Sequence, residues 1–156
     1  MELKGTTAVI TGSSGQIGAA IALALAQAGC NCICHYNHNE RVAKELVEQI
    51  EKLGTKALAV QADLTQLEKI EHLFERARKL GTPQVLVNSA SVFSRQPLPE
   101  VTFEDAQKVL QLNATVPILT SRVFAQRINA AFPTADSVVG KIINIADIGG
   151  IRPWAE

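Results

Sequence analysis

A glycine-rich turn between a predicted strand and a predicted helix is the first feature of the sequence that could do chemistry. It reads Thr11-Gly12-Ser13-Ser14-Gly15-Gln16-Ile17-Gly18, and an Ala/Leu-rich helix is predicted after it over residues 19–28. Glycines permit a tight turn and a close backbone approach, and unpaired amides at a helix start attract an anion. The turn therefore predicts a binding site for the diphosphate of a dinucleotide, with a ligand-free turn as the alternative interpretation.

Further polar residues stand at the ends of predicted strands or inside a predicted helix. Asp63 and Leu64 follow the third strand, Asn88-Ser89-Ala90-Ser91 end the fourth, Asn113 lies within a helical pattern, and Asp147 follows the fifth strand. Strand ends of a parallel sheet gather at one edge, where ligands bind. Each residue also has a structural interpretation, because an aspartate can cap a helix and an asparagine can face solvent.

The elements that must position these residues are predicted from periodicity. Short β-branched runs alternate with helical patterns, which is typical of a parallel sheet covered by helices on both faces. Thr65 with Glu68, and Thr102 with Asp105, form capping-box patterns at two helix starts, and Pro117 predicts a bend or break in a long helical stretch. Five strands are predicted, over residues 6–11, 31–35, 56–61, 84–88 and 141–146.

Together these elements predict a doubly wound α/β fold. Right-handed crossovers and a switch after the third strand give the strand order 3-2-1-4-5, with a ligand crevice beyond the carboxyl ends of the strands. The sequence contains no internal repeat, low-complexity segment or linker. Residues 1–156 are therefore interpreted as one dinucleotide-binding domain.

Composition argues against several other classes of protein. Fifteen Lys and Arg residues balance fifteen Asp and Glu residues, so no broad field attracts nucleic acid or an anionic membrane. The longest apolar run, residues 17–26, is about half the length of a membrane span. With no secretory signal at the start, we expect a cytoplasmic protein with a small-molecule substrate.

Three cysteines alternate along the second predicted strand. Cys30, Cys32 and Cys34 would point to one face of that strand, where neighbouring positions rarely form a disulfide. Buried free thiols are the prediction, and no metal is expected. Zinc binding by these cysteines remains the alternative, because His35 and His38 lie nearby in the sequence.

Taken in order, these motifs resemble the short-chain dehydrogenase/reductase family. Residues 11–18 resemble its Thr-Gly-x-x-x-Gly-x-Gly motif, with Gln16 where most members have the middle glycine. The resemblance implies a Rossmann-like oxidoreductase dependent on NAD(P)(H). It implies that Asp63 and Leu64 border the adenine, that Asn88, Ser89 and Ala90 border the nicotinamide ribose, and that Asn113 helps hold a proton-relay water.

Two positions resemble the pteridine reductases within that family. Asp147 stands where most members have a catalytic serine, and Phe93 follows Ser91 and Val92 after the fourth strand. The resemblance implies that Asp147 is catalytic, and that Phe93 stacks on a pterin beside Ser91. Dihydropterin or dihydrofolate reduction is the implied activity, and 3-oxoacyl thioesters or sugar or steroid carbonyls are the alternative substrates.

The end of the second strand bears on the choice of cofactor. An NAD-specific site should have an acidic residue there to bind the ribose hydroxyls, and none is found. Instead His35, Tyr36, Asn37, His38 and Asn39 occupy the segment, followed by Arg41. Although pteridine reductases usually have arginine at the positions of Gln16 and His38, NADP(H) is favoured over NAD(H).

The family's tyrosine and lysine, which complete its proton-transfer site, have no counterpart in the sequence. Its single tyrosine is Tyr36, so the catalytic pair is expected beyond Glu156, with the last strands and the catalytic helix. We therefore expect the fifth strand to lack part of its cover. A non-catalytic dinucleotide-binding module is the alternative from another class, and the resemblance implies a homotetramer.

Overall fold

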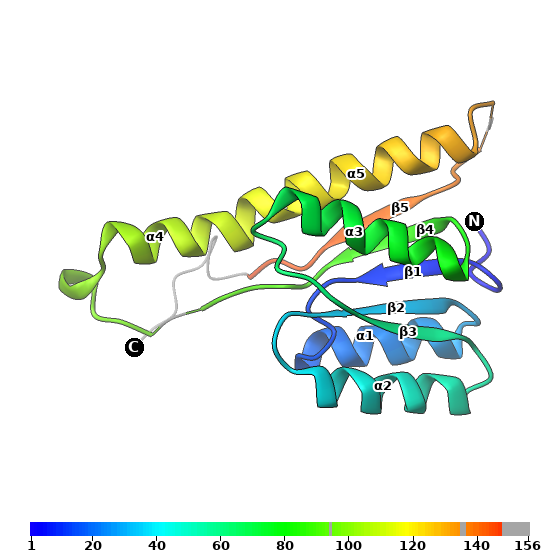
Figure 1. Cartoon of the computed structure of the whole chain (residues 1–156), viewed down its shortest axis with the longest axis horizontal. Coiled ribbons are helices and arrows are strands. Elements are labelled where there is room, and N and C mark those ends of the chain that lie inside the picture. The colour runs from blue at the N-terminus through cyan, green and yellow to red at the C-terminus, as the bar shows by residue number, and fades with distance from the viewer. Residues whose placement is uncertain (94, 135–136, 148–156) are drawn as a thin grey trace.

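A computed structural model describes residues 1–93, 95–134 and 137–147 of the chain. Its strands form a single parallel sheet in the order β3-β2-β1-β4-β5, which confirms the predicted topology (Figure 1). Each observed strand lies within two residues of its predicted bounds. The strands are β1 (Thr7–Ile10), β2 (Asn31–Tyr36), β3 (Ala57–Gln61), β4 (Pro83–Asn88) and β5 (Lys141–Asn144).

Helices cover both faces of the sheet. On one face lie α1 (Gln16–Gln27) and α2 (Glu40–Lys52), and on the other lie α3 (Leu67–Ala77) and α5 (Val116–Ala131) (Figure 1). The short helix α4 (Phe103–Leu110) precedes α5 and projects beyond the sheet. The remaining helical turns are η1 (Arg78–Leu80), η2 (Leu98–Glu100) and the π-helical turn η3 (Gln111–Thr115).

Alternation along the central strands builds a separate core on each face. In β1, Ala8 and Ile10 pack toward α1 and α2, whereas Val9 packs toward α3 and α5. The three cysteines are free and buried, and all belong to the α1/α2 core, as predicted: Cys30, Cys32 and Cys34. Because both faces of β1 and β2 are covered, these strands are apolar along most of their length.

The helix starts agree with the sequence in one place and differ in two. The Thr102–Asp105 capping box is present at α4, as predicted. The box predicted for Thr65 and Glu68 is wrong, because α3 begins at Leu67 and the amide and hydroxyl of Thr65 both donate to Asp63. Helix α1 begins at Gln16 rather than at residue 19, so the glycine turn leads into the helix earlier than predicted.

The long helical stretch is interrupted where Pro117 predicted a bend or break. The π-helical turn η3 separates α4 from α5 and ends directly before Val116 and Pro117. Proline has no amide hydrogen and its ring collides with the carbonyl four residues earlier, which here is that of Asn113. Widening the turn relieves that collision and places Asn113 within the irregular segment.

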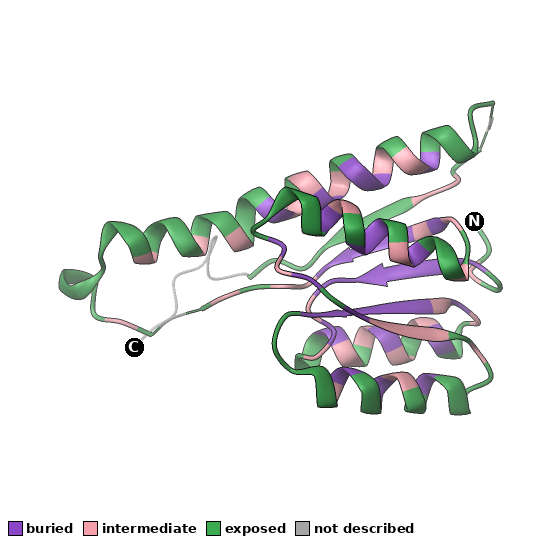
Figure 2. Cartoon of the chain, in the orientation of Figure 1, coloured by how far each residue is buried: buried purple, intermediate pink, exposed green. Residues whose placement is uncertain are grey.

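Strand β5 is the exposed edge of the sheet. All of its residues are exposed, whereas β1 and most of β2 and β4 are buried (Figure 2). Ile142 and Ile143 are 40% and 42% exposed, and Ile145 after the strand is 42% exposed. This confirms the expectation that strand five lacks part of its cover.

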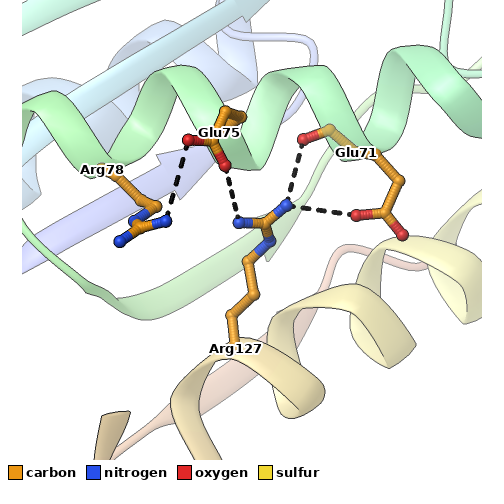
Figure 3. A network of polar contacts seen from close by, with 4 residues as sticks. All are labelled: Glu71, Glu75, Arg78 and Arg127. Carbon is orange, nitrogen blue, oxygen red and sulfur yellow. Dashed lines mark hydrogen bonds and ion pairs between the residues drawn. The ribbon is translucent and has the colours of Figure 1, made fainter. Parts of the chain in front are cut away.

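Arg127 connects α5 to α3 through a small ionic network (Figure 3). Its Nη1 lies 3.1 Å from Glu75 Oε2, and its Nη2 lies 3.2 Å from Glu71 Oε2 and donates to the Glu71 carbonyl. Glu75 also pairs with Arg78, at 3.7 Å. The Arg127 side chain is 26% exposed, so water screens these pairs only in part.

We expect Arg127→Gln to lower the free energy of unfolding by about 0.5–1 kcal/mol, because it removes both ion pairs between α3 and α5. Urea denaturation of the intact protein measures the change. Arg122→Gln, at an exposed position of the same helix, is the control. Equal losses in the two variants, or a loss that high salt does not reduce, would contradict the role given to Arg127.

Candidate functional site

A cleft of about 330 Å³ lies at the carboxyl ends of β1 to β4. Its volume is within the usual range for small-molecule sites in proteins. The loops after these strands supply its walls, as the topology predicted for a doubly wound sheet. The lining residues are Gly12, Ser14, Gly15, His35, Asn37, His38, Asn39, Ala62, Asp63, Leu64, Thr65, Ser89, Ala90, Ser91 and Leu112.

The glycine turn, residues 11–18, is packed closely against its surroundings. Gly12 has a φ of +67°, and a Cβ atom there would lie 2.7 Å from the Cα of Ala90. A Cβ atom at Gly18 would lie 2.5 Å from the carbonyl oxygen of Gly12. Only glycine fits at these two positions, and the backbone of the turn is thereby brought to the floor of the cleft.

Thr11 holds the glycine turn to the end of β4. Its Oγ1 accepts hydrogen bonds from the amides of Ser89 and Ala90, at 3.0 and 3.1 Å, and donates to the carbonyl of Val87 at 3.3 Å. The Thr11 amide also donates to Val87, at 2.9 Å. One hydroxyl therefore sets the spacing between two walls of the cleft.

The start of α1 has the features of an anion site. The first amides of a helix have no partner within the helix, and they carry the positive end of its dipole. Gly15 is the N-cap; within the described residues no side chain caps this start, and the first turn has no acidic residue. Gly12, Ser14 and Gly15 face the cleft directly beside it. A phosphate group fits this position because it would meet the first amides of α1 without a competing carboxylate.

His35 joins the glycine turn to the end of β3. Its Nδ1 accepts from the amide of Gly12 at 3.0 Å, and its Nε2 lies 2.9 Å from the carbonyl of Ala62. Burial lowers the pKa of His35, and the Ala62 hydrogen bond and the charge of Asp63 oppose that shift. The ring is therefore neutral at neutral pH, with its proton on Nε2.

Asp63 is ordered at the rim of the same cleft. Its Oδ1 accepts from the Thr65 hydroxyl at 2.7 Å and from the Thr65 amide at 3.0 Å, and Oδ2 accepts from Gln66 at 3.2 Å. The Thr65 hydrogen bonds lower the pKa of this carboxyl. Asp63 is thus a fixed, ionised acceptor beside the cleft.

The side chain of Asn88 makes its hydrogen bonds within the sheet and to α5, and it does not line the cleft. It is buried, donates to Asn144 Oδ1 at 2.8 Å and accepts from the Thr120 hydroxyl at 2.7 Å. These contacts join the ends of β4, β5 and the helix α5. Asn88 therefore positions the loop that carries Ser89 and Ala90.

Asn113 fastens η3 to the loop after β4. Its Oδ1 accepts from the Val92 amide at 2.9 Å, and its Nδ2 donates to the Val92 carbonyl at 2.8 Å. The side chain is thus occupied by the backbone of one residue. Because residue 117 is proline, it cannot donate to the Asn113 carbonyl as an α-helix would require.

With this geometry established, similarity to known proteins identifies the family. The sequence matches the short chain dehydrogenase family over residues 6–156. The chain belongs to the short-chain dehydrogenase/reductase family.

Individual members agree with this assignment. The chain is 36% identical over 155 residues to 3beta-hydroxysteroid dehydrogenase 1 of Eggerthella lenta, covering 98% of this chain and 57% of that protein. It is 37% identical over 123 residues to hydroxynaphthalene reductase arp2 of Aspergillus fumigatus, covering 78% of this chain and 45% of that protein. The chain thus spans about half the length of these relatives.

A solved structure has the same fold. The short chain dehydrogenase of Burkholderia cenocepacia, in complex with NADP, superposes with a TM-score of 0.87 at 28% identity, covering 99% of this chain and 60% of that one. This member of the family therefore has the same Rossmann-like architecture as a relative whose structure contains NADP.

The structure brings most of the predicted site residues of this short-chain dehydrogenase/reductase to the cleft, but not all. Ser13, Gly18, Tyr36 and Asn88 are buried behind its walls, and Gln16 and Ile17 are exposed outside its lining. Phe93 is 82% exposed after β4, and Asp147 lies three residues after β5, exposed and outside the lining.

Sequence reasoning missed four residues of the lining. Gly15 belongs to the glycine turn but has no predicted role, and Thr65 is predicted to cap a helix, yet both line the cleft. Ala62 and Leu112 directly precede Asp63 and Asn113. Adjacency to these polar residues was the one available signal, because a small or apolar lining residue has no chemistry of its own to mark it.

The buried thiols of Cys32 and Cys34, in the α1/α2 core, are poor candidates for metal ligands. Burial raises the pKa of Cys34 to about 12 and raises that of Cys32 further. A metal requires the thiolate, which is therefore scarce at neutral pH. Among residues 1–93, 95–134 and 137–147, no three His, Cys, Asp or Glu residues are grouped to hold a metal.

In the same segments, no helix is both long and apolar enough to cross a membrane.

We expect Thr11→Val to lower the free energy of unfolding by about 1–3 kcal/mol, because the amides of Ser89 and Ala90 would lose their acceptor without a change in side-chain volume. Thr11→Ser keeps the hydroxyl and should retain most of the stability. Urea denaturation of the intact protein compares the two variants. If serine proved as damaging as valine, packing of the threonine methyl would explain the loss and the hydroxyl would not.

Proposed function

We propose that this chain binds NADP(H) and forms the cofactor-binding part of an oxidoreductase. The observation that carries the proposal is the cleft that joins the glycine turn, the ends of β2 and β3, and the loop after β4. It has walls suited to a diphosphate at one point and to flat rings at others. Residues 1–156 are proposed as a dinucleotide-binding domain that lacks its last strands.

Each wall of the cleft suits a different part of the dinucleotide. The start of α1, with Gly12, Ser14 and Gly15 beside it, would receive the diphosphate. Asp63 and Leu64 would border the adenine. Ser89 and Ala90, held by the Thr11 hydroxyl, would border the nicotinamide ribose, so the nicotinamide would lie near the ends of β4 and β5.

The end of β2 supports NADP(H) over NAD(H). Asn37, His38 and Asn39 line the cleft, and no acidic residue stands among them to bind ribose hydroxyls. Arg41 pairs with Glu45 at 2.5 Å along α2 and is absent from the lining, so the amides and the imidazole would contact the 2′-phosphate. The NADP named for the Burkholderia cenocepacia structure supports the same choice.

We expect Asn37→Asp to weaken NADPH binding about tenfold, because the new carboxylate would repel the 2′-phosphate. NADH binding should improve, since that carboxylate could accept hydrogen bonds from the ribose hydroxyls. Titration of the intact protein with both cofactors, followed by nucleotide fluorescence, measures the two constants. Asn129→Asp adds the same charge at an exposed position of α5 and should change neither. A similar loss for both cofactors in Asn37→Asp would contradict the assignment.

The proposed reaction transfers a hydride. A bound nicotinamide supplies or accepts the hydride, and this chain would hold the substrate and part of the proton path. The Asn113 carbonyl, which lacks an α-helical donor at Pro117, is suited to hold a water. Asp147 would contact the substrate from the end of β5. The tyrosine and lysine of the family are proposed to follow Glu156.

A flat heterocycle is the proposed substrate, with dihydropterin or dihydrofolate first. Asp147, an acceptor-only group when ionised, suits an amino-pyrimidine better than an acyl chain. Phe93 offers a largely exposed ring for stacking. The names of two relatives favour a second candidate, a hydroxysteroid or hydroxynaphthalene ring.

We expect the intact protein to oxidise NADPH with dihydrobiopterin faster than with acetoacetyl thioesters or polycyclic ketones. Phe93→Ala should raise KM for the pterin about tenfold and change kcat less, because stacking contributes binding rather than chemistry. Phe93→Tyr keeps the ring and is the control. Faster turnover of polycyclic ketones would select the second candidate. No turnover of any of them, with dinucleotide still bound, would favour the non-catalytic module.

The assembly and location of the protein are part of the same proposal. Phe103, Leu110 and Ile118 are 71%, 63% and 68% exposed along α4 and α5, and they support burial against other copies in a homo-oligomer. The buried free thiols suit a reducing compartment such as the cytoplasm.

A further inference from the structure

His35 bonds to the glycine turn through its ring and through its backbone. Nδ1 accepts from the Gly12 amide, and the His35 carbonyl accepts from the Ser13 amide at 2.9 Å and from the Ser13 hydroxyl at 3.0 Å. On the far side of the ring, Nε2 meets the Ala62 carbonyl. The imidazole is thus a rigid spacer between the diphosphate end and the adenine end of the cleft.

The partners of the ring determine where its proton lies. A backbone amide can only donate, so Nδ1 must be unprotonated to bond Gly12. A carbonyl can only accept, so Nε2 must carry the hydrogen that Ala62 receives. Both contacts form together only in the neutral ring protonated on Nε2.

We propose that His35 is a positioning residue for dinucleotide binding, which holds Gly12 in its anion-binding conformation only while its Nδ1 is unprotonated. The proposal rests on the proposed binding of NADP(H) in this cleft. No contact between His35 and the reacting atoms is required. Dinucleotide affinity should therefore fall when His35 takes up a proton.

The geometry explains why this proton should act on the turn. A proton on Nδ1 would face the Gly12 amide hydrogen at a donor-to-donor distance of 3.0 Å, so the two groups must separate. Gly12 has little room, because its backbone is in close contact with Ala90 on one side and with Gly18 on the other. Movement of Gly12 would thus change the start of α1, where the diphosphate is proposed to bind.

The charged and titratable groups around His35 come from three segments. Asp63, beyond β3, favours the protonated ring, and burial opposes it and lowers the pKa of His35. On β2 itself, the Cys34 thiol has its pKa raised to about 12 by burial and stays neutral. His38, after β2, lines the same cleft and is a second imidazole that experiments must separate from His35.

Two substitutions separate the acceptor from the titrating group. His35→Asn can place an amide oxygen near the position of Nδ1, so it can accept from Gly12 but cannot titrate. His35→Leu has no acceptor. His72→Asn, at an exposed position of α3, is the histidine control. All variants are made in the intact protein carrying His38→Asn, so that the second imidazole of the cleft is absent.

The dissociation constant for NADPH is measured from about pH 8 to about pH 5. With His35 present, it should rise more across this range than in His35→Asn, and a tenfold larger rise would correspond to about 1.4 kcal/mol. The 2′-phosphate titrates near pH 6 in every variant, and the comparison removes its contribution. His35→Leu should bind weakly at every pH, and His72→Asn should behave like its parent. An equal pH dependence in parent and His35→Asn would overturn the proposal.

Nitrogen-15 NMR of the dinucleotide-free protein tests the hydrogen bond itself. At about pH 7.5, Nδ1 should be unprotonated and Nε2 protonated, and the Gly12 amide resonance should shift as the ring titrates. A proton on Nδ1 at that pH would overturn the proposal whatever the binding data show. Failure to bind NADPH or NADH at any pH, with this NMR pattern intact, would instead contradict the proposed function and remove the role in binding with it.

Unfolding must be separated from loss of binding. Because the pKa of His35 is lowered in the folded state, the unfolded chain takes up a proton first as the pH falls below about 6.5. Stability should therefore decrease from that pH downward until the folded pKa is reached. Circular dichroism at each pH shows where the fold is retained, and only those affinities are compared. If stability loss alone explained the binding curve, His35→Asn and its parent would retain equal affinity wherever both are folded.

Discussion

The site depends on the close contact between the glycine turn and the loop after β4. Gly12 approaches Ala90 so closely that a Cβ atom cannot be placed between them, and the Thr11 hydroxyl bonds both amides of Ser89 and Ala90. Backbone is thereby exposed to the cleft at the point where β1 leads into α1. Without this contact, the start of the helix and the loop after β4 would not form opposite walls of one cavity.

His35 provides a second connection between the glycine turn and the sheet. Thr11 relates β1 to β4, whereas His35 relates the turn to β3 through Ala62. Both connections use the full hydrogen-bonding capacity of a buried polar side chain, which is costly to leave unsatisfied. Thr11 and His35 therefore hold the glycine turn from two sides. Under the proposal above, the conformation of the turn depends on whether His35 is protonated.

The β5 edge of the sheet is more exposed. Strand β5 presents exposed isoleucines at the edge of the sheet, and the chain covers about half the length of its relatives. Asn88, Thr120 and Asn144 nevertheless join β4, β5 and α5 with polar contacts. These contacts hold the end of β5 in place, although the side chains of the strand are exposed to solvent.

Local sequence determined the elements and the glycine turn, because period-two and helical spacings and glycine turns depend on neighbouring residues. The strand order followed from those elements and the right-handed crossovers between parallel strands. It could not determine the partners of single polar side chains. Thr65 bonds Asp63 instead of capping α3, Asn113 is occupied by Val92, and His35 reaches Gly12. The tertiary structure decided these contacts. Packing brings together Asn113 and Val92, which are 21 residues apart, and His35 and Gly12, which are 23 residues apart. For Asp63 and Thr65, it favours one of two competing local hydrogen bonds.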